Sequence, residues 1–198
     1  SCCNGINSAA SCPSLTCCLL RYLFAARLHT DSLRAEYTIV LQTAAVEFSL
    51  QILNLDACEF SFTGCLHTYF GVPDSRQVEL RGLQGFSFDD KSDEMRTKVE
   101  SEDRIDLTSA AMLDRVYKGT CPQDQDGWFR LSDRSSRPPV LFDIQQSGFP
   151  DTVVFNPGDI GKQGNKGPDF DDDGYLRMLC VEPAVAAAPV SVAPGFCW

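Results

Sequence analysis

The segment that decides the fold is LRAEYTIVL, residues 33–41, in which apolar or aromatic side chains alternate with mainly polar ones. Alternate side chains of a β-strand point to opposite faces, so a period of two is typical of a half-buried strand. Residues 46–52, VEFSLQI, repeat the pattern with apolar side chains at every second position. The two segments predict two antiparallel strands.

A third apolar run, FSFTGCLHTYF at residues 60–70, is predicted as one strand and contains one of only two histidines in the chain. Alternation places Phe60, Phe62, Gly64 and Leu66 on one face. The other face receives Ser61, Thr63, Cys65, His67 and Tyr69. His67 therefore shares its face with hydroxyl side chains, which is typical of a polar cleft rather than of an apolar core.

The rest of the chain indicates an all-β fold. No long segment has the 3.6-residue period of a helix, and clusters of Gly, Pro and Asp separate short apolar runs. Many short strands with turn residues between them are typical of a β-sandwich or barrel. Further strands are predicted at residues 77–80, 98–107, 140–145, 151–155, 176–182 and 190–192.

Composition narrows the function classes. The 198 residues fit one domain with its own core, and the net charge of −10 argues against nucleic acid and anionic membrane surfaces as partners. No apolar run is long enough to span a bilayer, since the longest candidate, residues 17–26, contains Arg21. Residues 1–30 contain no acidic residue. We predict a leader or unmatched segment at 1–32, with disorder or a transit peptide as open alternatives.

Ten cysteines raise the question of redox compartment, and five of them lie within the first eighteen residues. No C-x-x-C pair occurs, and His29 is not at zinc-finger spacing from them. Free cysteine packs as a small apolar residue. We therefore expect reduced core thiols in an intracellular protein, with a secreted disulfide-rich binding module as the alternative.

Six motifs occur in a fixed order along the chain. They are FTGCLHTYF (62–70), VELRGLQGFSFDDK (78–91), LDRVY (113–117), DTVVFNP (151–157), DFDDDGYLRMLCVEPA (169–184) and PVSVAPG (189–195). In these motifs the chain resembles the glucose-6-phosphate 1-epimerases of the aldose 1-epimerase superfamily, from about Leu33 to Gly195. The resemblance implies an antiparallel β-supersandwich of the galactose mutarotase type at residues 33–198. It also implies a truncated N-terminus, because only 66 residues precede His67 and the family's N-terminal arginines have no counterpart.

The same resemblance implies an enzyme that interconverts the anomers of a hexose 6-phosphate. It assigns Glu182 as the base, His67 as the acid and Asp114 as a ligand of sugar hydroxyls. No cofactor and no metal is expected, and we predict a cytoplasmic monomer, with a plastid location as the alternative. A non-catalytic carbohydrate-binding or inactive remnant of the family remains an alternative function.

The residues themselves support these roles. Glu182 follows the apolar run 178–181, so partial desolvation should make its carboxylate a stronger base, and Pro183 predicts that the strand ends or bends there. An imidazole ionises near neutrality and suits the acid role of His67. The structural alternatives are a hydrogen-bonded core histidine, a solvated glutamate, and an Asp114 paired with Arg115 or Lys118.

Two further motifs are weaker. Residues 169–174 open like a calcium loop, but the twelfth loop position is Cys180 rather than Glu, so an acidic surface loop is the better interpretation. Residues 161–167 are Gly-rich but lack the P-loop pattern. Arg76, Arg81 and Arg177 are each candidates to supply positive charge to the site.

Overall fold

The computed structural model describes residues 22–108, 111–122, 125–135, 137, 140–159 and 171–198. These residues form two compact units, one from the N-terminal segment to Phe60 together with Val192–Trp198, the other Ser61–Ser191. None of the helices in the described ranges is both long and apolar enough to span a membrane.

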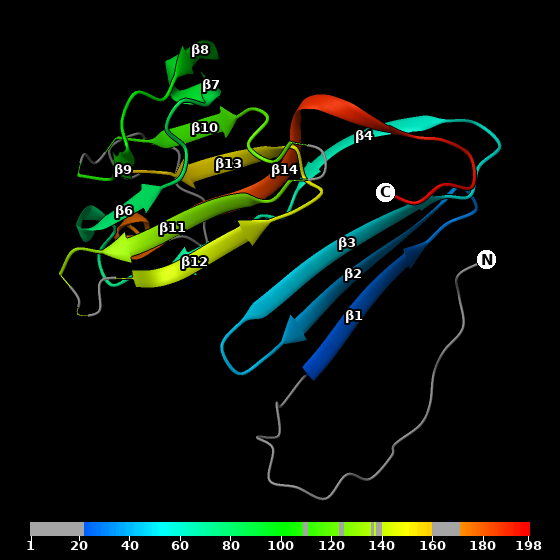
Figure 1. The fold of residues 1–198 in the computed structure, drawn as a ribbon, viewed down its shortest axis with the longest axis horizontal. Coiled ribbons are helices and arrows are strands. Elements are labelled where there is room, and N and C mark those ends of the chain that lie inside the picture. Colours follow the sequence, from blue (N-terminus) through cyan, green and yellow to red (C-terminus); the bar gives the residue numbers. More distant parts are fainter. Residues whose placement is uncertain (1–21, 109–110, 123–124, 136, 138–139, 160–170) are drawn as a thin grey trace, which may run out of the picture. The chain divides into compact units, whose positions relative to one another are not determined.

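The first unit is a three-stranded antiparallel sheet in the order β1-β2-β3 (Figure 1). The predicted strand at 33–41 is β2 (Leu33–Leu41), and the predicted strand at 46–52 is β3 (Val46–Asn54). β1 (Tyr22–His29) pairs with β2 along its whole length and lies inside the predicted leader 1–32. Residues 1–21 of that leader lie outside the described residues, and the boundary at residue 33 stays a prediction.

The C-terminal tail belongs to the same unit. Ile52 and Trp198 exchange two backbone hydrogen bonds, and Asn54 exchanges backbone contacts with residues 195 and 196. The Asn54 side chain is fully buried and donates to the carbonyls of Cys58 and Val192, at 2.9 and 2.8 Å. These bonds attach the last residues of the chain to the edge of β3.

The second unit contains two antiparallel sheets (Figure 1). The larger has seven strands, in the order β4-β14-β13-β10-β7-β8 with β5 also paired to β14. Its strands are β4 (Phe60–Cys65), β5 (Tyr69–Gly71), β7 (Ser87–Asp90), β8 (Arg96–Val99), β10 (Leu113–Tyr117), β13 (Asp151–Asn156) and β14 (Met178–Val192). The smaller, in the order β12-β11-β6-β9, comprises β6 (Val78–Arg81), β9 (Arg104–Asp106), β11 (Gly127–Asp133) and β12 (Val140–Gln146).

The predicted all-β antiparallel fold is confirmed, with three short 3-10 helices as its only helical elements in the described ranges: η1 (Ser75–Gln77), η2 (Lys91–Asp93) and η3 (Gly174–Arg177). Several strand bounds differ from the predictions. The predicted strands 176–182 and 190–192 are one strand, β14, and the predicted strand 98–107 is divided between β8 and β9. The strands β1, β7, β10 and β11 were not predicted.

The main core lies between the two sheets of the second unit. Its buried side chains come from β6, β9 and β11 on one side and from β7, β10, β13 and β14 on the other. Leu179 and Val181 of β14 point into this core. The intervening residues, Cys180 and Glu182, therefore project from the opposite face of the same strand. That opposite face carries the candidate site.

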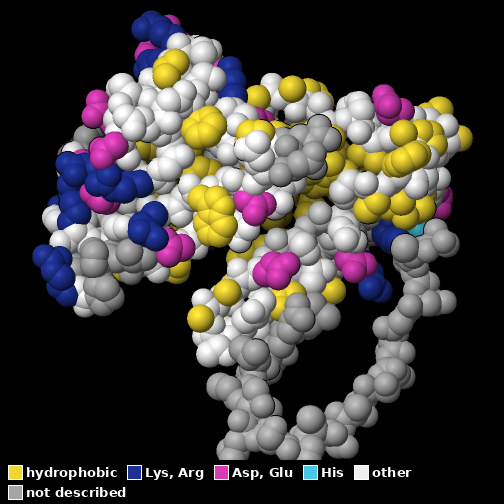
Figure 2. Space-filling model, viewed as in Figure 1, with side chains coloured by type: hydrophobic (Ala, Val, Ile, Leu, Met, Phe, Trp, Pro, Cys, Tyr) yellow, Lys and Arg dark blue, Asp and Glu magenta, His cyan; other side chains and the backbone are white. Residues whose placement is uncertain are grey.

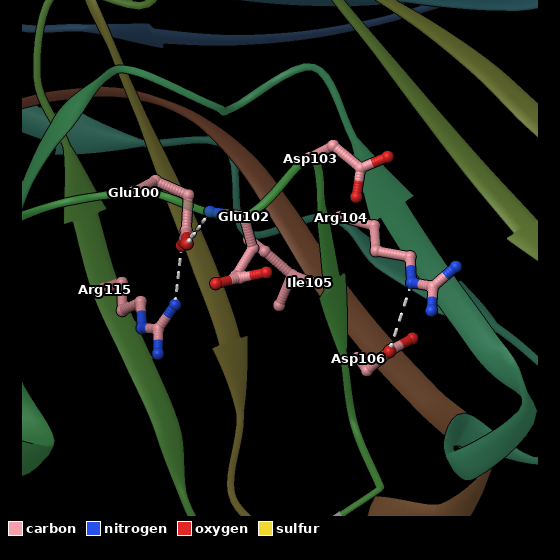
Figure 3. Close-up of a pocket in the computed structure, with 7 residues that line it drawn as sticks. All are labelled: Glu100, Glu102, Asp103, Arg104, Ile105, Asp106 and Arg115. Atoms are coloured by element: carbon pink, nitrogen blue, oxygen red, sulfur yellow. Dashed lines mark hydrogen bonds and ion pairs between the residues drawn. The ribbon is translucent and has the colours of Figure 1, made fainter.

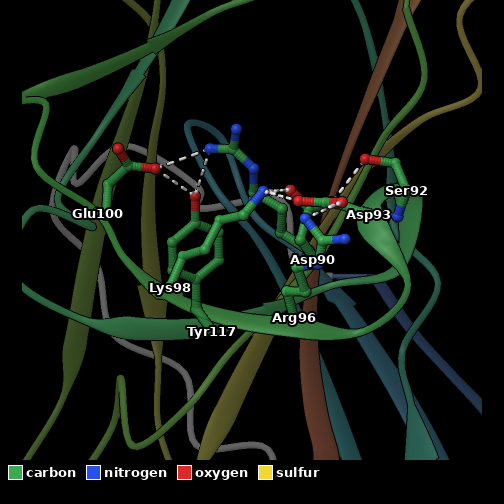
Figure 4. Close-up of polar contacts among 8 residues, drawn as sticks. Asp90, Ser92, Asp93, Arg96, Lys98, Glu100 and Tyr117 are labelled. Atoms are coloured by element: carbon green, nitrogen blue, oxygen red, sulfur yellow. Dashed lines mark hydrogen bonds and ion pairs between the residues drawn. The ribbon is translucent and has the colours of Figure 1, made fainter.

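Buried polar groups on the core side are paired. The hydroxyl of Tyr117 and Nη1 of Arg115 both donate to Oε2 of Glu100, at 2.7 and 2.8 Å (Figure 4). Burial raises the pKa of Tyr117, so its hydroxyl keeps its proton and serves as the donor. Nearby, Asp90 accepts from Lys98 at 2.8 Å and from the hydroxyl of Ser92. Such pairing offsets the cost of burying these charges.

Outside the core, many charged side chains of the second unit lie beside charges of the opposite sign. On the face that Figure 2 shows, Lys and Arg are interspersed with Asp and Glu over this unit. Arg130 and Asp143, for example, approach to 2.6 Å, and both are more than half exposed. Exposed pairs of this kind contribute little to stability.

Candidate active site

His67 lies in a gap between two strands of the larger sheet. β4 ends at Cys65 and β5 begins at Tyr69, and both pair with β14. The three residues between them form a tight turn, in which the N–H and the hydroxyl of Thr68 both bond to the carbonyl of Leu66, at 2.7 and 3.1 Å. The predicted single strand 60–70 is therefore wrong at its centre, and His67 lies at the middle of the turn.

Pro183 explains why the interruption occurs at this point. Its carbonyl accepts a bond from the N–H of Leu66 at 3.0 Å, so its ring nitrogen faces the same neighbour. Proline has no N–H to donate. A strand that paired with β14 opposite Pro183 would therefore have one backbone carbonyl without a donor. The strand does not end at Pro183. β14 continues to Val192, with Pro183 opposite Thr152 of β13, and it is the neighbouring strand that is interrupted.

His67 and Glu182 are in direct contact. Nδ1 of His67 lies 2.5 Å from Oε1 of Glu182. The histidine side chain is 49% exposed, whereas the glutamate side chain is only 4% exposed. Because an ionised carboxylate only accepts hydrogen bonds, Nδ1 carries the proton and donates to it. The structure thus brings together the two residues that the sequence assigns to proton transfer.

Tyr69 contacts the other ring nitrogen. Its hydroxyl lies 3.1 Å from Nε2 of His67, and the two ring centroids are 4.6 Å apart. Partial burial raises the pKa of Tyr69, and the negative charge of Glu182 adds to the effect. The phenol therefore keeps its proton near neutrality and donates to Nε2 of a neutral imidazole. In the imidazolium form, Nε2 donates to the phenol oxygen instead.

Two thiols complete the surroundings of Glu182. Burial, a hydrogen bond to Glu182 and its negative charge raise the pKa of the Cys65 thiol to about 11, although the positive charge of Lys91 opposes the shift. Burial and the negative charge of Glu182 raise the pKa of the Cys180 thiol to about 12. Both thiols are protonated near neutrality, so Cys65 is a donor to the Glu182 carboxylate.

The predicted core position of the cysteines is only partly correct. All five cysteines of the described ranges are free, but only Cys121 and Cys180 are buried. Cys58, Cys65 and Cys197 are exposed, because they lie at a loop, at a strand end and in the C-terminal tail. Cys2, Cys3, Cys12, Cys17 and Cys18 lie outside the described residues.

Asp114 lies on the same face of the sheet. It is opposite Phe155 of β13, which in turn is opposite Cys180 of β14. Directly opposed residues share a face, and Cys180 and Glu182 share it by alternation. The spacing of strands puts the Cα atoms of Asp114 and Glu182 about 12 Å apart, two strands across and two residues along. The ring of Phe155 lies between them in the sheet, with its centroid 6.2 Å from that of His67.

The partner of Asp114 is Lys91 of η2, whose Nζ lies 3.5 Å from Oδ1. Neither predicted alternative holds, because Arg115 pairs with Glu100 and Lys118 pairs with Asp89. The three arginines proposed from the sequence also have carboxylate partners. Arg76 binds Asp74, Arg81 binds Glu79 and Asp103, and Arg177 binds Asp171 and Asp173. Lys91 is the cation beside Asp114.

A cavity of about 490 Å³ lies elsewhere in the second unit (Figure 3). Four of its seven lining residues are acidic, and its two arginines are paired, Arg115 with Glu100 and Arg104 with Asp106. His67, Asp114 and Glu182 are not among its lining residues. The cavity is therefore distinct from the predicted site, and its acidic lining does not suit an anionic substrate.

The described residues include only part of the acidic loop 169–174 and none of the Gly-rich segment 161–167. Asp171 and Asp173 of the acidic loop form ion pairs with Arg177, as a surface loop would. Asp169, Phe170 and the Gly-rich residues 161–167 lie outside the described residues.

Sequence reasoning placed Cys65 and Tyr69 on the same face as His67 but gave neither a role in the site. Cys180 was assigned to the core, although it lies two positions before Glu182 in the same strand and so shares its face. That spacing could have identified it. Lys91 gave no such signal, because its contact with Asp114 joins residues 23 positions apart (114 − 91).

Comparisons with known proteins agree with this fold. The aldose 1-epimerase family model matches residues 29–198. A relative from Cenchrus ciliaris, named "Putative glucose-6-phosphate 1-epimerase", is 33% identical over 145 residues, which are 73% of this chain and 41% of the relative. A relative of the same name from Haemophilus influenzae is 27% identical over 166 residues, which are 79% of this chain and 55% of the relative.

Solved structures show the same fold. A "putative mutarotase" from Salmonella typhimurium superposes with a TM-score of 0.67 at 21% identity, covering 87% of this chain and 56% of that one. A galactose mutarotase related enzyme from Lactobacillus acidophilus gives a TM-score of 0.61 at 12% identity, covering 89% and 64%. The predicted galactose mutarotase-like fold is thus confirmed.

The chain spans about half the length of the curated relatives that it matches. The family match nevertheless covers all of the second unit and both residues of the His67–Glu182 pair. The chain belongs to the aldose 1-epimerase family.

Proposed function

We propose that this chain interconverts the α and β anomers of a hexose 6-phosphate by acid–base opening and closing of the sugar ring. The observation that carries the proposal is the contact between His67 and Glu182, a proton donor and a proton acceptor that converge at 2.5 Å. The phosphate is suggested by the names of the relatives from Cenchrus ciliaris and Haemophilus influenzae.

Convergence of the two groups is what the reaction requires. The C1 hydroxyl and the ring oxygen of a pyranose are bonded to the same carbon, so the base and the acid must act on neighbouring atoms. Glu182 takes the proton of the C1 hydroxyl, and the C1–ring-oxygen bond breaks as the carbonyl forms. His67 gives a proton to the departing ring oxygen. Rotation of the aldehyde and reclosure with the roles reversed produce the other anomer.

Burial suits each group to its role. Glu182 is almost inaccessible to water and accepts hydrogen bonds from His67 and Cys65. His67 is half exposed and lies in a turn, so it can move away from Glu182 to admit the sugar. A proton transfer needs heavy atoms about 2.6–3.2 Å apart. A modest displacement of the imidazole then places the C1 and ring oxygens between the two groups.

The part of the same sheet face around Asp114, across from His67 and Glu182, would bind the rest of the sugar. Asp114 presents a carboxylate whose lone pairs can accept from ring hydroxyls. Lys91 pairs with it and so offsets the negative charge that an anionic substrate would otherwise meet at Asp114. The ring of Phe155 offers an apolar surface between this end and His67.

The proposal is tested by anomer exchange in glucose 6-phosphate. Exchange of the two anomeric protons, measured by NMR exchange spectroscopy, should be faster with the chain than without it. The comparison without protein is essential, since the sugar phosphate also mutarotates unaided. Free glucose serves as the matched substrate. Faster exchange of free glucose alone would overturn the phosphate preference, and no acceleration of either sugar would overturn the enzymatic function.

Replacement of Asp114 by Asn tests the hydroxyl-binding role. A hydrogen bond to a charged group is worth about 1.5–3 kcal/mol, so kcat/KM should fall about 10- to 100-fold, mainly through KM. The control is Asp143→Asn, which removes an exposed carboxylate from β12 in the other sheet. Equal kinetic constants for both variants would assign Asp114 to the Lys91 ion pair alone.

A further inference from the structure

Three potential metal ligands converge at the acid–base pair. A ring nitrogen of His67, the Sγ of Cys180 and a carboxylate oxygen of Glu182 all lie within 4.8 Å of one another. The Cys65 thiol lies outside this group of three but hydrogen-bonds to the same carboxylate. Cys180 and Glu182 are fixed in the central strand β14 and are buried, whereas His67 and Cys65 are exposed. A small ion can therefore enter from the exposed side and meet two preorganised donors at the base.

The donor set is selective. Thiolate, imidazole and carboxylate together suit zinc and similar thiophilic cations, whereas magnesium and calcium prefer oxygen ligands alone. Around a tetrahedral zinc ion, with bonds of about 2.0–2.3 Å, ligand atoms lie about 3.5 Å apart. The present atoms would need shifts of roughly 1 Å to reach that spacing. Rotation of the half-exposed His67 side chain can supply much of this shift.

We propose that His67, Cys180 and Glu182, with Cys65 as the fourth ligand, form a site for Zn²⁺ or a similar thiophilic divalent cation. The cation takes the place of the proton between His67 and Glu182. The imidazole changes tautomer and carries that proton on Nε2, and the protons of the two thiols go to the solvent. Both groups of the acid–base pair are then coordinated. Bound metal therefore excludes proton transfer to a sugar, and the site is inhibitory rather than catalytic.

Occupancy can be measured without any activity. Cobalt(II) reports the geometry of a zinc site, since thiolate ligands give a charge-transfer band in the near ultraviolet and a tetrahedral site gives strong visible bands. The full chain, reduced, is titrated with Co²⁺ and then with Zn²⁺. Because five cysteines lie at residues 2–18, the informative signal is the part that depends on the proposed ligands.

Cys180→Ala and His67→Gln should each weaken Co²⁺ binding at this site at least tenfold, since changes even to groups behind metal ligands cost about 10- to 100-fold. Cys121→Ala is the control, because it removes another buried thiol, one bonded to the carbonyls of Gln125 and Gln146. His67 is exposed, so its variant should fold even if Cys180→Ala does not. Spectra of Cys180→Ala or His67→Gln equal to that of Cys121→Ala would overturn the site.

Inhibition is the second readout and rests on the proposed function. Zn²⁺ should slow anomer exchange in the unmodified chain, and a chelator should restore it. Zinc sensitivity, measured relative to each variant's own metal-free rate, should fall at least about tenfold in Cys180→Ala and not in Cys121→Ala. A cobalt spectrum that depends on Cys180 in a chain without exchange activity would support the metal site and count only against the proposed function.

Discussion

Replacing Glu182 by Gln should lower kcat/KM for anomer exchange by about 10²- to 10⁴-fold, the range that a general base contributes. The amide has nearly the shape of the carboxylate but cannot take up the proton of the C1 hydroxyl. The side chain is buried and bonded to His67 and Cys65, so no water can replace it as a base at the same place. The measurement is NMR exchange in glucose 6-phosphate against the rate without protein.

The matched control for this change is Glu100→Gln. Glu100 is also buried, but it contacts Arg115 and Tyr117 on the core side of the sheet. Both variants remove a buried charge, and both can lower the free energy of unfolding, which urea titration records. Only Glu182→Gln should abolish exchange. A Glu182→Gln chain that is folded and exchanges anomers at the unmodified rate would contradict the base assignment.

Replacing His67 by Gln should also reduce kcat/KM about 10²- to 10⁴-fold, because the amide can occupy the same turn but cannot supply an acidic proton. The control is His29→Gln, at the other histidine of the chain, which is exposed at the end of β1. Since His67 is 49% exposed and lies in a three-residue turn, its loss should have little effect on stability.

Chemical rescue gives a positive readout for the acid role. A smaller variant, His67→Gly, leaves an exposed space where the imidazole ring was. Added imidazole should restore part of the exchange in this variant and none in Glu182→Gln. A purely structural histidine would show no such rescue. Equal exchange in His67→Gln and the unmodified chain would exclude the acid assignment.

The fold class could be predicted because the period of two is a local property. β2 was predicted residue for residue, since every position of LRAEYTIVL contributes to the pattern. β10 gave no such pattern, because its side chains are partly or fully buried on both faces. In β11, Phe129 and Leu131 are buried while Trp128 is exposed. An apolar side chain on the solvent face hides the alternation there.

The site was predictable in its chemistry and not in its geometry. Alternation predicted that His67, Cys65 and Tyr69 share a face, although His67 lies in a turn rather than in a strand. The position of Glu182 follows from its strand. The turn at residues 66–68 depends on Pro183, more than a hundred positions away, so no local pattern announces it. No local pattern predicts the Lys91–Asp114 contact either. The roles of His67, Glu182 and Asp114 stay predictions.

Pro183 of β14 also keeps β4 and β5 apart as two separate strands. If residue 183 had an N–H, Leu66 and its neighbours could pair fully with β14, and β4 and β5 could fuse into one continuous ribbon. His67 would then be part of a regular paired strand instead of lying at the middle of a turn. The missing amide hydrogen of Pro183 in β14 thus leaves a gap in strand pairing between β4 and β5, and His67 lies in that gap.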